Sequence, residues 1–214
     1  KSIGPVEISP ERMDLSEIQN NRFCFPDAEA AKEAESYLDQ KIAECDSVGG
    51  VVECVISGLP VGLGEPVFEK LDANLAKAIL SIGAVKGFEI GDGFAATKAC
   101  GSENNDEFRM DGDKIVKETN HAGGVLGGIS DGSDVIFRAA FKPTPSIAKS
   151  QETVTKDGEN IDLVIHGRHD PVVVPRAVVV VESMAAITAM DMLLMSMPSR
   201  LDLIQMFFQV ENAD

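Results

Sequence analysis

The stretch that decides the fold runs from Gly49 to Ile90 and reads "GGVVECVISGLPVGLGEPVFEKLDANLAKAILSIGAVKGFEI". Its opening "GGVVECVISG" is short, rich in β-branched residues and bounded by glycines, which predicts a strand. A helix is expected next, with Pro66 at its first position and Gly83 at its end. The segment "AVKGFEIG", Ala84 to Gly91, predicts a second strand. The order strand, helix, strand favours an α/β or α+β layer.

Outside this stretch, the apolar spacing predicts two more helices and several strands. Asp27 suits an N-cap, and a helical stripe continues from it to about Cys45.

Residues 91–113 are polar and glycine-rich, which predicts a long loop. The segment "DVIFRAAF" alternates like a strand, and "ETVTKDGENIDLVI" predicts a hairpin around Asp157 and Gly158. From Pro175 the apolar period becomes helical. No internal repeat is present, so we expect one domain over 1–214, with an irregular start at 1–25 and a helix end and tail at 198–214.

Composition limits the partners. The net charge of the 214 residues is −16, which argues against nucleic acid, because a phosphate backbone needs a basic face. An anionic substrate would need a local cationic pocket, because the negative electrostatic field of the whole chain repels it. We expect no membrane partner and no apolar run that approaches the length of a bilayer span. The four scattered cysteines indicate reduced thiols in a cytoplasmic protein, and the three histidines lack the spacing of a metal site.

Three short segments carry residues with chemistry. The glycine-rich "TNHAGGVLGGISDG", residues 119–132, suits either a ligand held by main-chain N–H groups or a tight pair of turns. In "FKPTPSI", residues 141–147, two prolines stiffen the segment. This stiffness either fixes the orientation of Lys142 and Thr144 or simply makes a rigid edge turn. In "GRHDP", residues 167–171, Arg168 and Asp170 suit an anion and a proton, or else a surface ion pair. The spacing alone leaves each pair of alternatives open.

Taken together, these segments resemble a known family. "GLGEPVFEKLDANLAKAILSIGAVKGFEIGDGF", "NHAGGVLGGISDG", "KPTPSI" and "GRHDPVVVPRAVVVVESMAAI" are similar, in the same order and at similar separations, to segments of chorismate synthase. The resemblance covers about residues 58–194. It implies an α+β fold, a β-α-β sandwich of the chorismate synthase type, of which this chain would form a part. It also implies a cytoplasmic homotetramer.

The resemblance further implies an activity. The family converts 5-enolpyruvylshikimate 3-phosphate into chorismate and phosphate, an anti-1,4-elimination that needs reduced FMN and closes the common part of the shikimate pathway to the aromatic amino acids. NADPH is the expected reductant, and whether the protein reduces its own flavin stays open. By position, the catalytic residues would be Asp170, which handles the proton at flavin N5, and Arg168, near the substrate phosphate. The flavin contacts would be Gly83, Ala84, Gly127, Lys142, Pro143, Thr144, Pro145, Ser146 and Arg168.

The chain also departs from the family. Two segments of the family, of the types "SHG" and "RASxRE", are absent from these residues. We therefore expect a C-terminal portion of the enzyme that is inactive and binds flavin weakly by itself. The alternative to an enzyme is a fragment that acts only as a folding or assembly module. An unrelated phosphate-binding α/β protein is a third possibility. His169 stays without a role, because orienting Asp170 and filling space suit it equally.

Overall fold

The computed structural model describes residues 1–167, 169–199 and 201–209. Those residues form a five-stranded sheet in the order β2-β1-β3-β9-β4 and three separate strand pairs, β10-β11, β5-β6 and β7-β8. The strands are β1 Ser2–Ile3, β2 Val6–Glu7, β3 Gly50–Ile56, β4 Val85–Ile90, β5 Phe108–Asp111, β6 Lys114–Lys117, β7 Val125–Leu126, β8 Ile129–Ser130, β9 Val135–Phe141, β10 Gln151–Val154 and β11 Asn160–Leu163. The α-helices are α1 Ala28–Ala43, α2 Leu71–Leu80, α3 Gly101–Asn104, α4 Val174–Ser196 and α5 Leu201–Gln209, and the 3-10 helices are η1 Pro10–Arg12, η2 Leu15–Gln19, η3 Gly93–Lys98 and η4 Met197–Ser199.

The chain divides into two compact units. Unit 1 holds Lys1–Val52, Gly83–Gly87 and Ala139–Val180, and unit 2 holds Glu53–Ile82, Phe88–Arg138 and Val181–Asp214. Strands β3, β4 and β9 and helix α4 each run from one unit into the other. This division does not test the expectation of one domain over 1–214, because four continuous elements belong to both units.

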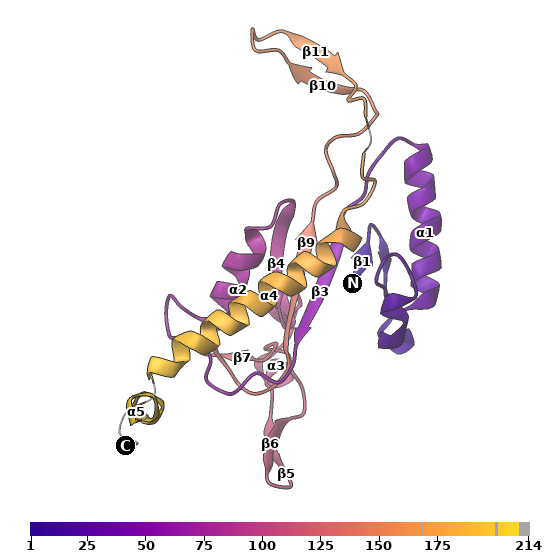
Figure 1. The fold of residues 1–214 in the computed structure, drawn as a ribbon. Helices are drawn as coiled ribbons and strands as arrows, with labels where there is room; N and C mark the ends of the chain where they lie inside the picture. Colours follow the sequence, from indigo (N-terminus) through magenta and orange to yellow (C-terminus); the bar gives the residue numbers. More distant parts are fainter. Residues whose placement is uncertain (168, 200, 210–214) are drawn as a thin grey trace. The chain divides into compact units, whose positions relative to one another are not determined.

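Unit 1 contains the predicted N-terminal helix, α1, and its cap. The buried Asp27 carboxylate accepts hydrogen bonds from the N–H groups of Glu29 and Ala30, and so satisfies two donors that the first turn leaves free. Residues 1–25, expected to be irregular, contain β1, β2 and two 3-10 helices, and β1 pairs with both β2 and β3. Helix α1 packs against β2, beside the N-terminus in Figure 1.

Unit 2 is built around the buried side of α2. Leu71, Leu75 and Ile79 recur at helical spacing and are fully buried. The predicted start at Pro66 was wrong, because Val67 has φ +76° and cannot continue a helix. The helix begins instead at Leu71, whose N–H donates to Gly128 O. The predicted end at Gly83 was also wrong, since α2 stops at Leu80.

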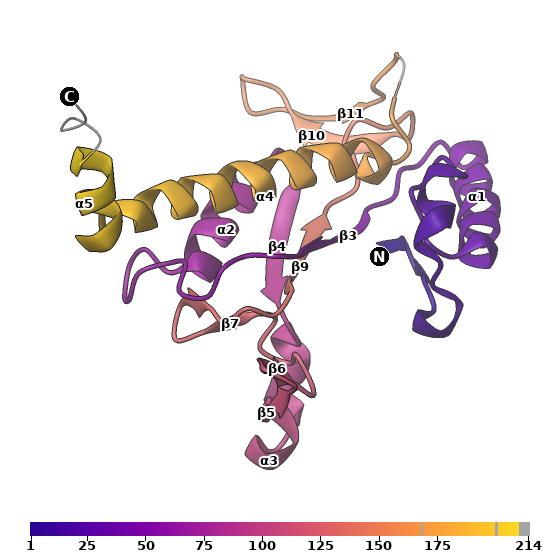
Figure 2. The ribbon, with the colours of Figure 1, turned by 60° about the horizontal axis from the view of Figure 1, so that its bottom comes forward.

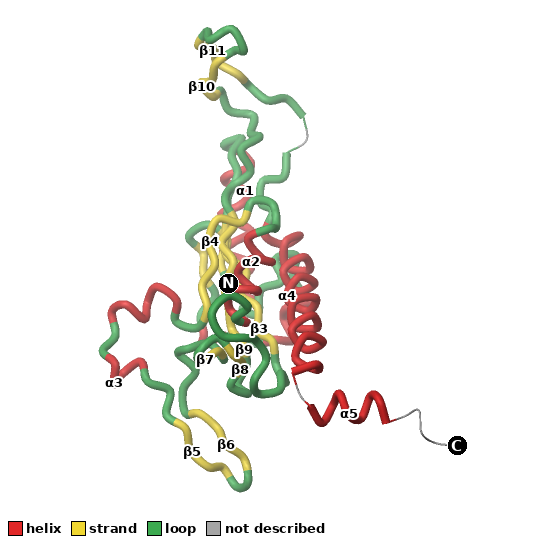
Figure 3. Tube along the Cα trace, turned by 90° about the vertical axis from the view of Figure 1, so that its left-hand side faces the viewer, coloured by secondary structure: helices red, strands yellow, loops and turns green. Residues whose placement is uncertain are grey.

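The predicted loop 91–113 contains more structure than its composition indicated. It holds η3, α3 and β5, and β5 pairs with β6 in an antiparallel hairpin that is plain in Figure 3. The strand expected at "DVIFRAAF" is confirmed as β9, with alternate side chains buried at positions 135, 137, 139 and 141.

The C-terminal region continues beyond α4. Helix α4 is followed by η4 and then by α5, which points in a different direction in Figure 2 and ends at Gln209. The tail expected at the end of 198–214 falls largely on residues 210–214, which lie outside the described residues. Within the described residues, Val174–Ser199 is the one helix long and apolar enough to cross a membrane. The expectation that no apolar run reaches that length was therefore wrong. Length and composition alone are weak grounds for a membrane span, and Val181, Ala185 and Met192 of this helix are buried in the protein.

Candidate functional site

The structure divides the predicted site residues between the two units. Unit 1 contains Gly83, Ala84, the segment 142–146 and Asp170, whereas unit 2 contains Gly127. Arg168 lies outside the described residues. Most of the predicted set therefore lies in unit 1.

Two predicted segments meet where β4 begins and β9 ends. The N–H of Lys142 donates to the carbonyl of Ala84 at 3.0 Å, so "GA" and "KPTPS" are joined although 58 positions separate these two residues (142 − 84). Ala84 has φ +71°, a left-handed conformation that costs a non-glycine residue about 1 kcal/mol or more. Strained backbone of this kind gathers at ligand sites, which fits a cofactor contact at Ala84.

The segment 142–146 is anchored from its other side by the loop between α1 and β3. Ser47 Oγ donates to Thr144 O at 2.6 Å. Gly49 lies so close that a Cβ there would be 2.3 Å from Phe141 O, so only glycine fits. With Pro143 and Pro145 fixing φ at two positions, the segment has little freedom.

One buried atom of this segment has no partner. Thr144 Oγ1 is buried and makes no hydrogen bond to any part of the chain that the structure describes. Leaving a buried hydroxyl unpaired costs about 1–3 kcal/mol, which a bound molecule with a complementary polar atom would recover. The neighbouring Lys142 side chain is exposed, and its ammonium has no ion-pair partner among residues 1–167, 169–199 and 201–209.

The "GRHDP" turn is held by hydrogen bonds at its C-terminal end. Val48 N–H donates to Pro171 O at 2.8 Å, which ties the turn to the start of β3. Asp170 Oδ2 accepts a hydrogen bond from Arg176 Nη1 at 2.6 Å. The two side chains are 37% and 71% exposed, so the pair contributes little stability, about 0–1 kcal/mol, and acts mainly to orient the carboxylate.

His169 belongs to the same turn but does not contact Asp170 through any recorded hydrogen bond. Its Nε2 lies 2.9 Å from the carbonyl oxygen of Ile165. The imidazole is thus held by its own loop. Of the two roles left open by the sequence, orienting Asp170 gains no support from this geometry.

A pocket of about 370 Å³ in unit 1 brings the two loops together. Its walls come from the end of α1, the α1–β3 loop, residues Ile147 and Ala148 after the "KPTPS" segment, and the turn from His169 to Pro171. Asp170 therefore lines the same pocket as the continuation of the predicted flavin segment. The side chains of Lys142 and Thr144 are not part of its wall.

The α1–β3 loop supplies site residues that the sequence did not single out. Asp46 and Ser47 line the pocket, and Lys149 Nζ donates to Asp46 Oδ2 at 2.5 Å. The hydrogen bond from Lys149 lowers the pKa of the Asp46 carboxyl. No local signal could have found this pair, because its two members are 103 positions apart.

The glycine-rich loop of unit 2 has two kinds of glycine. A Cβ at Gly123 would be 2.3 Å from Gly91 N, and one at Gly128 would be 2.4 Å from Lys70 Cγ, so these glycines permit close packing within the protein. Gly127 differs, because a Cβ there meets nothing within 4 Å. Tight turns thus account for much of the loop, and Gly127 is the position where the main chain is open to a ligand.

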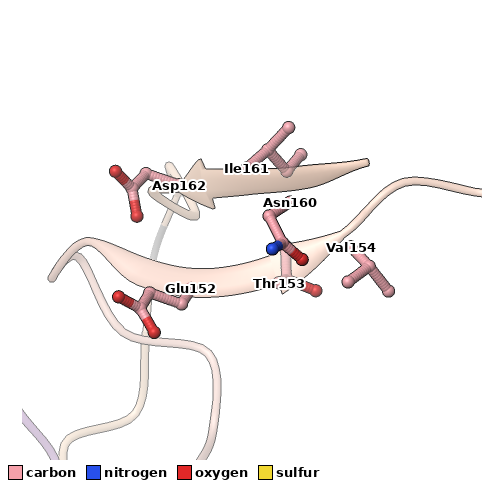
Figure 4. A pocket seen from close by; sticks show the side chains of 6 residues that line it. All are labelled: Glu152, Thr153, Val154, Asn160, Ile161 and Asp162. Carbon is pink, nitrogen blue, oxygen red and sulfur yellow. The ribbon is translucent and has the colours of Figure 1, made fainter. Parts of the chain in front are cut away.

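A further pocket of about 420 Å³ lies on the β10–β11 hairpin and contains none of the predicted residues. Figure 4 shows its carboxylates, Glu152 and Asp162, which are cross-strand partners in the hairpin register. Two like charges in opposite positions destabilise a strand pair. This exposed acidic surface does not suit an anionic substrate, so the candidate site is the pocket that Asp170 lines.

Comparison with known proteins identifies the family. The family model for chorismate synthase matches residues 1–194. Proteins named chorismate synthase from Agathobacter rectalis and Lachnoclostridium phytofermentans are 63% and 60% identical over 209 and 210 residues, in each case 98% of this chain and 57% of the relative. The chain thus spans little more than half the length of these relatives.

A solved structure agrees with this match. The structure titled "Crystal Structure of Chorismate Synthase" aligns with a TM-score of 0.75 and 29% identity, over 97% of this chain and 59% of that one. The prediction of an α+β fold of the chorismate synthase type, present in part, is confirmed. Both the family match and the fold lead to one conclusion: this chain belongs to the chorismate synthase family.

Proposed function

We propose that the protein carrying this chain is a chorismate synthase, which is a lyase. It would convert 5-enolpyruvylshikimate 3-phosphate into chorismate and phosphate by anti-1,4-elimination, with reduced FMN as its cofactor. The observation that carries the proposal is the junction in unit 1, where Lys142 N–H bonds Ala84 O. It joins two segments that family resemblance assigns to one flavin. The pocket that Asp170 lines adds a proton-transfer group to the same unit.

The residues present suit a flavin. The unpaired hydroxyl of Thr144 offers a hydrogen bond to a polar atom of the ring system, and the strained backbone of Ala84 is typical of a ligand contact. Lys142 has an exposed ammonium that can offset the negative charge of a reduced flavin. Together with Gly83, Pro143, Pro145, Ser146, Gly127 and Arg168, these residues would hold the cofactor.

The chemistry then divides between cofactor and protein. A bound reduced flavin supplies electron density to the substrate as phosphate departs and recovers it afterwards. Asp170, with its carboxylate oriented by Arg176, would be the protein's proton-transfer group beside the flavin. Arg168 offsets the charge that develops on the leaving phosphate, and the stiff 142–146 segment keeps cofactor and substrate in one orientation.

The assembly proposed for the whole protein follows the family: a cytoplasmic homotetramer with NADPH as the source of reducing equivalents. Nucleic acid does not suit a chain of net charge −16. The tetramer can be tested by sedimentation of the intact protein.

A second candidate function rests on length. The chain spans 57% of its relatives, which favours a portion that folds or assembles without catalysing the reaction alone. Two measurements separate the candidates. Phosphate release from 5-enolpyruvylshikimate 3-phosphate by the intact protein with reduced FMN tests the enzyme, and its absence would remove the proposal. Flavin titration of the 214-residue chain tests the portion, for which we expect a Kd weaker than about 1 μM.

Replacing Lys142 tests the cofactor contact. In the intact protein, Lys142→Ala should weaken flavin binding by roughly tenfold or more, the loss of one charge-assisted hydrogen bond, and should change substrate affinity less. Flavin binding is measured by fluorescence and substrate affinity by steady-state kinetics. Lys156→Ala, in the turn between β10 and β11, is the matched control and should change neither. A larger loss for substrate than for flavin would refute the role given to Lys142.

A further inference from the structure

The connection between α1 and β3 contacts both segments on which the proposed reaction depends. On one side, Ser47 Oγ donates to the carbonyl oxygen of Thr144 at 2.6 Å. On the other side, the N–H of Val48 donates to Pro171 O at 2.8 Å. Two consecutive residues of the connection therefore hold the predicted flavin segment and the "GRHDP" turn.

These two segments meet through the connection rather than through each other. Within the described residues, no recorded hydrogen bond joins the flavin segment, 142–146, directly to the turn residues 169–171. The contact on the turn side is reinforced by a parallel bridge between Val48 and Val172. The separation of the two segments is thus set largely by Ser47 and Val48.

The prolines explain why the flavin segment depends on a side chain from outside. Pro143 and Pro145 have no N–H, so regular main-chain pairing is interrupted on both sides of Thr144. The carbonyl of Thr144 is bonded instead by the hydroxyl of Ser47. Loss of that hydroxyl would release the middle of the segment.

Ser47 is itself held from both sides. The carboxylate of Asp46 accepts from Ser47 N–H at 2.8 Å and, through its other oxygen, from Lys149 Nζ at 2.5 Å. After Ser47, the main chain passes so close to β9 that a Cβ at Gly49 would lie 2.3 Å from Phe141 O. These contacts leave the Ser47 hydroxyl little freedom to move away from Thr144.

The effect of Ser47 on the site passes through Thr144. Its hydroxyl proton is used by the carbonyl of Thr144, whereas Thr144 Oγ1 is buried and has no hydrogen-bond partner in the described chain. Fixing the carbonyl fixes the backbone of the residue whose side chain is proposed to contact flavin. A displacement of about 1 Å at such a position can lower a rate by roughly 10² although no reacting group is removed.

We infer that Ser47 is a positioning residue, whose hydroxyl sets the separation between the flavin segment and Asp170. The inference rests on the proposed function, which assigns the flavin to 142–146 and proton transfer to Asp170. A serine that only stabilised the fold would behave differently. Its loss would lower the melting temperature and leave the turnover of each folded molecule unchanged.

Replacing Ser47 by Ala in the intact protein tests the inference. The change removes one hydroxyl and keeps the hydrogen bond from Val48 N–H to Pro171 O. We expect kcat to fall roughly tenfold, as a small misplacement would cause, while KM for the substrate changes by less than about twofold. Ser36→Ala is the matched control, because Ser36 is exposed on α1 and donates to Lys32 O of its own helix at 3.2 Å. The control should change neither constant.

A double-mutant cycle with Asp170→Asn separates positioning from a general weakening of the fold. If Ser47 places the flavin segment relative to Asp170, Ser47→Ala should lower kcat by less than about twofold once residue 170 is Asn. A purely structural role would give the same factor in both backgrounds. Thermal unfolding followed by far-UV circular dichroism gives a temperature at which every variant is folded.

The outcomes distinguish this inference from the proposed function. Absence of phosphate release by the unchanged intact protein would count against the proposed function and would remove the inference with it. If the unchanged protein turns over, three results would overturn the inference alone: a Ser47→Ala variant equal to Ser36→Ala, a rise in KM as large as the fall in kcat, or equal factors in the two backgrounds.

Discussion

Turnover of the intact protein is expected to fall by about 10² or more when Asp170 is replaced by Asn, while KM for the substrate stays nearly the same. The amide has almost the shape of the carboxylate, so the turn tied to Val48 is kept. It can neither accept nor return a proton under these conditions. If Asp170 handles the proton at flavin N5, chemistry is lost and binding is retained. Steady-state kinetics with reduced FMN measure both quantities.

The matched control for this variant is Asp162→Asn. Asp162 lies on strand β11, outside the pocket that Asp170 lines. We expect turnover of this control to stay close to that of the unchanged protein. An unchanged rate for Asp170→Asn would remove Asp170 from the mechanism. Equal losses in both variants would mean that the loss is not specific to the carboxylate of Asp170, and would also count against its role.

Local chemistry explains which elements could be predicted from the sequence. The cap at Asp27, the alternation along β9 and the hairpin β10–β11 depend on neighbouring residues, and all three are confirmed. The start of α2 could not be predicted, because Pro66 suits a helix while the left-handed Val67 prevents one. That conformation is a property of the folded protein, which local propensity does not record.

The same reasoning applies to the candidate site. Family resemblance placed Ala84 and Lys142 in one site, and the structure joins them by a hydrogen bond. Whether they contact flavin stays a prediction. Ser47, which bonds Thr144 across 97 positions, could not be found from spacing, since serine in a loop has no distinguishing pattern. Long-range contacts of single polar residues are set by the fold.

The other large effect is expected at Lys117, which lies among carboxylates inside unit 2. Its ammonium is 2.7 Å from Asp131 Oδ2, 3.3 Å from Asp106 Oδ2 and 3.1 Å from Asn120 Oδ1, and only 2% of its side chain is exposed. Burial raises the pKa of Asp106, but hydrogen bonds from Ala122, Thr119 and His121 outweigh it and hold this pKa below the ordinary value of 3.8. The carboxylate is therefore charged in the folded protein and needs its cation.

The sign of the pH dependence follows from this lowered pKa. A carboxyl with a lower pKa in the folded state stabilises the fold fully above the pKa of the unfolded chain. The contribution is lost as the pH falls below about 4 toward the folded-state pKa. Burial also raises the pKa of Asp131, but the hydrogen bonds from Lys117 and Ser133 together outweigh it and lower this pKa. Both acids are therefore ionised at neutral pH, where Lys117 neutralises part of their charge.

Lys117→Met should consequently lower the free energy of unfolding at pH 7 by about 3–5 kcal/mol, the cost of leaving buried charge without its partner. Urea unfolding followed by far-UV circular dichroism measures this, because the chain has no Trp and one Tyr. Lys114→Met, on the same strand but exposed, should change it by less than about 0.5 kcal/mol. Adding Asp131→Asn to Lys117→Met removes one uncompensated charge and should restore part of the loss. If Lys117→Met were no less stable than Lys114→Met, water would reach these carboxylates and the buried ion pairs would not stabilise the fold.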